Sequence, residues 1–312
     1  MRLVTYISGP QAQQPRIGVR VGHRILDIEN ASRVNGEPLP SSMRALLQMG
    51  RGALARVQAL AKAAQSGGGR FGSAMLEEKA IRFLPPVPDP DKFLCVGKNY
   101  RAHLEELKRN DLIKEMPEEP TGFVKLNSSL VGHDARVTRP AVVEHLDYEP
   151  ELVFVIGKRA LGVKADDDDP LDYVVGVTLL NDLTDRDMQK REVASGSRFW
   201  TSKNAPGFGP IGPEIVTMDE IDDPYDLWIT CAVNGEERMR VNTRDQIWKL
   251  PRILEHFSRS MPLEPGDMFS TGAPGGVAVG KPDAEDLYLK PGDVVECSIE
   301  GVTTLKTTIV AP

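Results

Sequence analysis

From residue 147 to residue 157 the chain reads Asp-Tyr-Glu-Pro-Glu-Leu-Val-Phe-Val-Ile-Gly, with two glutamates at the head of an apolar run. The β-branched and aromatic residues of the run predict a buried strand. Since side chains two positions apart on a strand point to the same face, we expect Glu149 and Glu151 to lie side by side. Such a pair needs a shared proton, an arginine or a metal ion if it is buried, whereas two solvated glutamates at the start of a strand are the alternative.

A third carboxylate follows the next predicted strand, residues 173–180, at Asp182. An acidic side chain at a strand end can complete an oxygen site with Glu149 and Glu151 and leave positions for water or substrate. Oxygen-only ligands favour a hard cation such as Mg²⁺, Mn²⁺ or Ca²⁺. The alternative is that Asp182 caps the helix expected to begin at residue 185.

Composition limits the classes of partner and compartment. The 312 residues include 38 basic and 45 acidic side chains and no Lys/Arg-dense stripe, which excludes a nucleic-acid partner. The three cysteines form neither a metal-finger pair nor a disulfide framework, which suits a reducing cytosol. No apolar run has signal-peptide or membrane-spanning character, so we predict a cytoplasmic protein with no membrane partner.

The pattern along the chain predicts an α+β, mostly β protein with two domains, 1–80 and 81–312. In the first we expect strands at 3–7, 16–21 and 24–28 and one helix at about 42–64. The second follows a stiff proline-rich segment at 84–90 and is expected to be a rolled, mostly antiparallel sheet. Its predicted strands are 93–96, 151–156, 173–180, 228–233, 238–242, 267–270, 294–299 and 303–310, and its helices are 100–108, 185–194 and 251–258. The pair Asn234-Gly235 is a strong hairpin signal.

Two further segments carry candidate chemistry. His103 and Glu106 are three positions apart on a predicted helix, so the carboxylate can hold the imidazole tautomer and raise its basicity, as in a water-activating dyad. The alternative is an ordinary pair of surface residues. Lys203 lies in a Gly/Pro-rich loop, where it could stabilise an oxyanion or be a plain surface lysine.

Together, and in the same order along the chain, these motifs resemble the fumarylacetoacetate hydrolase superfamily over residues 93–310. The resemblance implies its mixed β-roll fold, a homodimer, and Mg²⁺ or Mn²⁺, with Ca²⁺ as an alternative, held by Glu149, Glu151 and Asp182. It further implies that His103 and Glu106 form a catalytic dyad on a mobile lid, Tyr100 to Phe123. The remaining expected site residues are catalytic Lys203 and substrate-binding Arg186, Gln189, Tyr100, Thr271 and Gly272.

Three positions depart from the superfamily's pattern. Ala273 replaces the second threonine of a Thr-Gly-Thr-Pro turn. Val193 stands where eukaryotic fumarylacetoacetases have a substrate-facing tyrosine, and Val96 stands where they have an additional aspartate ligand. These differences predict a bacterial-type member that acts on a smaller keto acid.

The expected reaction is metal-dependent hydrolysis of an acylpyruvate, in aromatic or sugar-acid catabolism. Arg186 and Lys203 would offset the negative charge of the metal ligands, the dyad would deprotonate water, and the site would stabilise a pyruvate enolate. The same enolate-stabilising site would serve oxaloacetate decarboxylation, keto–enol isomerisation or hydration of an unsaturated keto acid. Other hypotheses are a Schiff-base lyase that uses Lys203 and a calcium-stabilised binding module without enzymatic activity.

Overall fold

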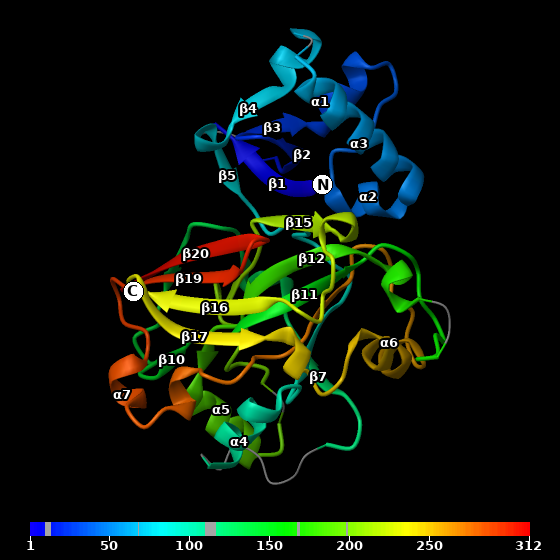
Figure 1. The fold of residues 1–312 in the computed structure, drawn as a ribbon. Helices are drawn as coiled ribbons and strands as arrows, with labels where there is room; N and C mark the ends of the chain where they lie inside the picture. Colours follow the sequence, from blue (N-terminus) through cyan, green and yellow to red (C-terminus); the bar gives the residue numbers. More distant parts are fainter. Residues whose placement is uncertain (10–13, 68, 110–116, 167–168, 198) are drawn as a thin grey trace.

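One long sheet runs through both halves of the chain in the computed structural model of the protein (Figure 1). The structure describes residues 1–9, 14–67, 69–109, 117–166, 169–197 and 199–312. The sheet has the order β4 (Met75–Glu77), β3 (Arg24–Asp27), β2 (Arg16–Val21), β1 (Arg2–Ser8), β15 (Glu214–Thr217), β12 (Val174–Asn181), β11 (Pro150–Ile156), β18 (Met268–Ser270), β6 (Phe93–Gly97) and β7 (Thr121–Val124), and β5 (Ile81–Phe83) also pairs with β1.

A second sheet has five strands in the order β17 (Glu236–Asn242), β16 (Trp228–Val233), β19 (Val294–Ile299), β20 (Thr303–Val310) and β9 (Ala135–Thr138). Two short ladders pair β10 (Leu146–Asp147) with β13 (Thr184–Asp185), and β8 (Leu130–Val131) with β14 (Gly209–Pro210). Most pairings are antiparallel, and Asn234 and Gly235 take positive φ angles in the predicted β16–β17 hairpin. The predicted α+β, mostly β fold is confirmed.

Strand β11 is buried at all seven of its positions because apolar clusters cover both of its faces. Leu152 and Phe154 belong to the cluster that includes the five-stranded sheet. Val153 and Val155 belong to the cluster formed with the N-terminal helices. This double burial explains why the run after Glu151 is continuously apolar and does not alternate.

Among its described residues, the N-terminal segment has three α-helices, α1 (Ile28–Val34), α2 (Met43–Gln48) and α3 (Arg51–Gln65). The prediction of one helix at 42–64 is wrong, because Gly50 takes a φ of 75° and separates α2 from α3. Helix α1 was not expected; the Asp27 side chain caps it by accepting a hydrogen bond from the Asn30 N–H at 2.8 Å.

Strand pairing connects the two predicted domains. Strand β5 lies just beyond the predicted boundary at residue 80, yet it pairs with β1. Strand β1 pairs in turn with β15, so the long sheet continues from the first predicted domain into the second. Figure 1 shows the N-terminal strands and helices as a smaller lobe above the larger one.

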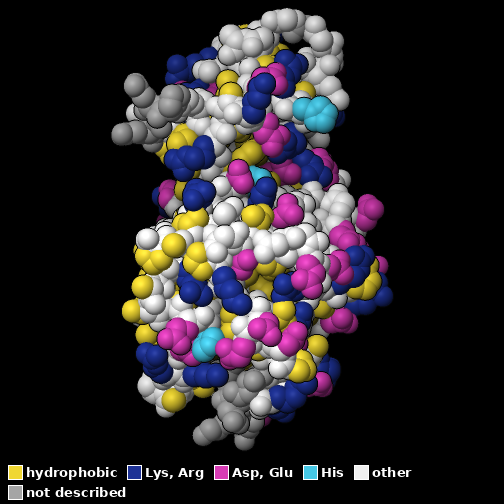
Figure 2. Space-filling model, turned by 90° about the vertical axis from the view of Figure 1, so that its left-hand side faces the viewer, with side chains coloured by type: hydrophobic (Ala, Val, Ile, Leu, Met, Phe, Trp, Pro, Cys, Tyr) yellow, Lys and Arg dark blue, Asp and Glu magenta, His cyan; other side chains and the backbone are white. Residues whose placement is uncertain are grey.

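The larger lobe has helices α4 (Arg101–Arg109), α5 (Arg186–Ala194), α6 (Leu250–Ser258) and α7 (Ala284–Leu287), so the three predicted helices are confirmed. Helices α4 and α5 lie at the lower end of the molecule in Figure 1. Within the predicted lid segment, 110–116 lie outside the described residues. No helix in the described part of the chain is long and apolar enough to cross a bilayer. On the face in Figure 2, acidic and basic side chains are interspersed.

Candidate active site

The pairing of β11 with β12 brings the three predicted metal ligands together. The antiparallel register places Pro150 opposite Asn181, so Glu149 and Glu151 flank the end of β12 where Asp182 follows. The Asp182 N–H donates to the Glu149 carbonyl oxygen at 2.8 Å and fixes this arrangement. One oxygen from each of the three carboxylates lies within 4.8 Å of the others, and all three residues are buried. Because Glu149 and Glu151 are both buried, the alternative that they are solvated residues at the start of a strand is excluded.

Two cations neutralise part of this carboxylate cluster. The Lys203 Nζ donates to Asp182 Oδ2 at 2.6 Å and to Thr184 Oγ1 at 2.8 Å, and it also contacts Glu149. The Arg186 guanidinium lies 2.7 Å from Glu149 Oε1. Burial works against ionisation of Glu149, but Lys203 and Arg186 outweigh it and lower its pKa to about 2.

Glu151 has the opposite electrostatic setting. Burial, and then the neighbouring Asp182, raise the pKa of Glu151 well above its usual range. Its Oε2 accepts the Gly272 N–H at 3.1 Å, and no ion pair between described residues involves it. A buried carboxylate without a cationic partner, beside two others, fits a hard divalent ion.

Two residues of the site were missed by the sequence analysis. Asp147 accepts hydrogen bonds from Arg186 Nε at 2.8 Å and pairs with its Nη2 at 2.7 Å, so it aims the guanidinium at Glu149. The sequence did contain a signal for Asp147, because it stands two positions before Glu149, as Glu149 stands two positions before Glu151. Lys125 is 1% exposed, and its Nζ donates to Asp182 Oδ1 at 2.7 Å and to the Phe208 carbonyl at 2.9 Å. No local pattern marks Lys125, because its partners are 57 and 83 positions away.

The predicted dyad lies on α4. His103 Nδ1 is 3.1 Å from Glu106 Oε2, and the two residues are only 5% and 8% exposed. The second carboxylate oxygen, Glu106 Oε1, accepts the Gly276 N–H at 2.7 Å. The pair is therefore held against the glycine-rich turn and is not the exposed helix pair of the alternative interpretation.

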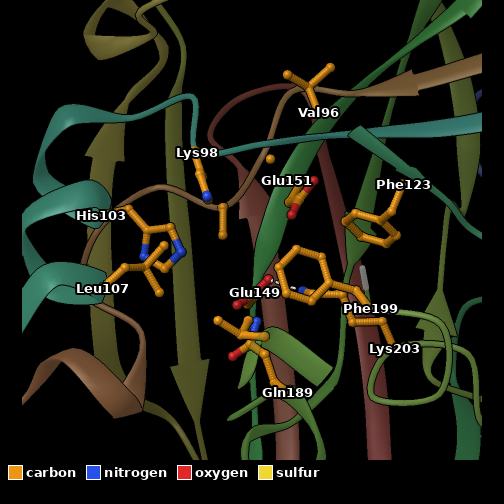
Figure 3. A pocket seen from close by; sticks show the side chains of 13 residues that line it. Val96, Lys98, His103, Leu107, Phe123, Glu149, Glu151, Gln189, Phe199 and Lys203 are labelled. Atoms are coloured by element: carbon orange, nitrogen blue, oxygen red, sulfur yellow. Dashed lines mark hydrogen bonds and ion pairs between the residues drawn. The ribbon is translucent and has the colours of Figure 1, made fainter. Parts of the chain in front are cut away.

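A cavity of about 40 Å³ separates the dyad from the carboxylates. In Figure 3, Lys98 and His103 approach it from one side, and Glu149, Glu151 and Lys203 lie on the other. Its lining consists of Val96, Gly97, Lys98, His103, Leu107, Phe123, Glu149, Glu151, Gln189, Val193, Phe199, Lys203 and Ala273. All three positions that depart from the superfamily's pattern, Val96, Val193 and Ala273, are in this lining.

Four of the five predicted substrate-binding residues, Tyr100, Arg186, Thr271 and Gly272, do not line the cavity. Tyr100 is buried, and its hydroxyl accepts a hydrogen bond from Gln246 Nε2 at 3.1 Å. Thr271 and Gly272 lie behind Glu151, where the Thr271 N–H donates to the Leu152 carbonyl at 2.9 Å. Arg186 is fully engaged by carboxylates and by Gln189 Oε1, at 2.9 Å, whereas Gln189 does line the cavity.

Glu151→Gln is expected to lower the affinity for Mn²⁺ by more than about 100-fold, beyond the loss typical of an outer-shell partner. The amide removes the negative charge of a carboxylate that forms no ion pair with another described residue. Titration calorimetry of chelator-treated protein measures the effect. The matched control is Glu106→Gln, a buried glutamate outside the cluster, and equal losses in both variants would contradict the assignment of Glu151 as a ligand.

Comparison with known proteins places this geometry in a family. The family model "Fumarylacetoacetate (FAA) hydrolase C-terminal" matches residues 92–310. The mitochondrial oxaloacetate tautomerase fahd2 of Xenopus laevis is 34% identical over 312 residues, which cover 99% of this chain and 90% of that protein. The oxaloacetate tautomerase YisK of Bacillus subtilis is 33% identical over 290 residues, 92% of this chain and 93% of that protein.

A solved structure shares the fold over the whole chain. Maleylpyruvate hydrolase from Sphingobium sp. SYK-6, in complex with manganese(II) and pyruvate, has a TM-score of 0.74 and 28% identity, and the match covers 100% of this chain and 99% of that one. The manganese in that structure and the buried carboxylate cluster of this protein both indicate a divalent metal. The protein belongs to the fumarylacetoacetate hydrolase family.

Proposed function

We propose that the protein is a divalent-metal-dependent keto–enol tautomerase of oxaloacetate. The observation that carries the proposal is the buried His103–Glu106 pair, which faces the carboxylate cluster across a cavity of about 40 Å³. One water needs roughly 10–15 Å³ of such space, so the cavity has room for about three waters. A small ligand in this cavity would meet both the dyad and the carboxylate cluster, since His103, Glu149 and Glu151 all line it.

The charges of the site suit an anionic substrate. Four buried carboxylates, Asp147, Glu149, Glu151 and Asp182, lie beside three buried cations, Lys125, Arg186 and Lys203, which form ion pairs with all of them except Glu151. Four negative and three positive charges leave a net charge of minus one, which a divalent ion would turn into plus one. The 2-oxo carboxylate would restore neutrality, so its binding requires the ion.

The dyad would move the proton. When bound by Glu149, Glu151 and Asp182, a divalent ion would polarise the 2-oxo group and make the C3 protons more acidic. Glu106 holds the Nδ1 side of the His103 ring, so Nε2 is the nitrogen that would move the proton. It would take a proton from C3 and deliver it to the enolate oxygen, and in ketonisation it would take the enol proton and deliver it to C3. Lys203 and Arg186 hold the carboxylates in place, and Gln189 offers an amide to the bound acid.

Two further observations support this reaction. The full-length relatives named above are oxaloacetate tautomerases, and both matches extend over the N-terminal segment as well as the family region. Val96 and Val193 line the cavity where the eukaryotic fumarylacetoacetases have an aspartate and a tyrosine, and Ala273 lines it where the family usually has a threonine. Fewer polar groups then face the part of a substrate beyond its 2-oxo acid end.

His103→Ala is expected to lower the rate of enol-oxaloacetate ketonisation by about 10²- to 10⁴-fold, the contribution of a general base. The decay of enol absorbance in the presence of Mg²⁺ or Mn²⁺ measures it. His23→Ala, at an exposed position in the β2–β3 turn, is the control and should leave the rate unchanged. Full activity in His103→Ala would rule out this base.

Hydrolysis of an acylpyruvate is the second candidate, favoured by the match to a maleylpyruvate hydrolase and by a dyad that could activate water. Parallel assays of acylpyruvate cleavage, enol-oxaloacetate ketonisation and pyruvate release from oxaloacetate separate hydrolase, tautomerase and decarboxylase. Cleavage of acylpyruvates at a higher kcat/KM than ketonisation would replace the proposal. A Schiff-base lyase is disfavoured because the Lys203 ammonium already donates to three acceptors.

A further inference from the structure

The turn after β6 holds a lysine in a backbone conformation that favours glycine. Lys98 has a φ of 61°, in the left-handed region that few residues other than glycine adopt. Such a conformation is strained and persists only where the surrounding structure imposes it, often at a functional site.

The neighbouring Asn99 imposes the left-handed conformation on Lys98. The Asn99 side chain is buried; its Nδ2 donates to the carbonyls of Trp248 at 3.0 Å and Thr271 at 2.9 Å, and its Oδ1 accepts the Trp248 N–H at 2.7 Å. The Ile247 N–H donates to the Asn99 carbonyl at 2.7 Å. Because Asn99 is fixed on several sides, the Lys98 side chain is directed from a rigid turn.

The Lys98 side chain is directed into the active-site cavity. Lys98 lines the cavity, and Figure 3 shows its amino group pointing inward between His103 and Glu151. Lys203, the other lysine of the lining, donates to Glu149 and Asp182 and is thereby committed to the carboxylate cluster. The two lysines therefore serve different ends of the cavity.

We propose that Lys98 binds the distal carboxylate of a 2-oxo dicarboxylic acid and so selects dicarboxylates over monocarboxylates. The inference rests on the proposed function, since it assumes that the 2-oxo acid end lies at the carboxylate cluster. A single net positive charge at the loaded cluster balances the first carboxylate only. The second carboxylate lies at the opposite end of the substrate, on the side of the cavity that Lys98 enters.

The test compares two ligands that cannot enolise, so binding is measured without turnover. Difluorooxaloacetate has a distal carboxylate and trifluoropyruvate has none, and both lack a C3 proton. Calorimetry of the Mn²⁺-loaded protein should show that Lys98→Met weakens difluorooxaloacetate binding by about 10- to 100-fold, the contribution of a charge-assisted hydrogen bond. Trifluoropyruvate binding should change by less than about 2-fold, because its distal end carries no charge.

Two control variants complete the experiment. Lys98→Arg keeps the cation and should retain most of the preference for the dicarboxylate. Lys108→Met removes an exposed lysine on α4 outside the cavity lining and should change neither affinity. Equal weakening of both ligands by Lys98→Met, or no weakening, would overturn the inference. Failure of the wild-type protein to tautomerise oxaloacetate would instead refute the proposed function, and the binding comparison would still report on Lys98.

Discussion

Lys125→Met is expected to lower the free energy of unfolding by about 3–5 kcal/mol, the cost of breaking a buried ion pair from one side. This is a large part of the roughly 5–15 kcal/mol that stabilises a typical protein. The lysine is 1% exposed and donates to Asp182 Oδ1, to the Phe208 carbonyl and to the Lys203 carbonyl. Methionine fills the same volume but leaves these acceptors without a donor in a place that excludes water.

Urea unfolding of the metal-free protein, followed by circular dichroism, measures the change. Lys92→Met is the matched control, since the Lys92 Nζ pairs with Asp267 at 2.8 Å but is 24% exposed. Asp267 also accepts the backbone N–H groups of Lys92 and Glu264, so it keeps two partners in the control variant. We expect that variant to lose about 1 kcal/mol or less. Similar losses in both variants would contradict the structural role given to Lys125.

Gly280→Ala is expected to lower the catalytic rate by about 10²-fold, the effect of misplacing a catalytic group by about 1 Å. Gly280 ends a short turn, residues 278–280, that packs against α4. An added Cβ would lie 2.7 Å from Glu106 Cγ and 2.8 Å from its Oε1, so the glutamate would have to move. It would then lose its place beside His103 Nδ1 and the Gly276 N–H.

The effect on the rate should appear without a loss of metal binding, because Gly280 does not touch the carboxylate cluster. Ketonisation kinetics and Mn²⁺ calorimetry on the same preparation show this. Gly52→Ala is the control: it lies on α3, where an added Cβ meets nothing within 4 Å. It should keep full activity and gain up to about 1 kcal/mol of stability, because alanine favours the helix. Normal kinetics in Gly280→Ala would show that Glu106 tolerates displacement.

Local periodicity was sufficient for the parts of the site that lie within one element. Glu149 and Glu151 share a face because strand side chains alternate, and His103 meets Glu106 because helix neighbours are three positions apart. The hairpin at Asn234-Gly235 follows from residues that accept positive φ. The break at Gly50 was misjudged, since an isolated glycine is tolerated within many helices.

Contacts between distant segments were decided only by the tertiary structure. Lys125 reaches Asp182 although β11, β18 and β6 lie between β12 and β7 in the long sheet and 57 positions separate the two residues along the chain. Likewise, no spacing indicates that Val96, Val193 and Ala273 line one cavity, or that Lys98 enters it from a turn held by Asn99. The sequence by itself determined the family, through the order of its motifs, and it determined the Glu149–Glu151 pair and the dyad, because each of these pairs rests on short-range geometry. Strand pairing and helix docking decided which cations, apolar walls and backbone groups surround them, because these contacts depend on the whole chain being folded.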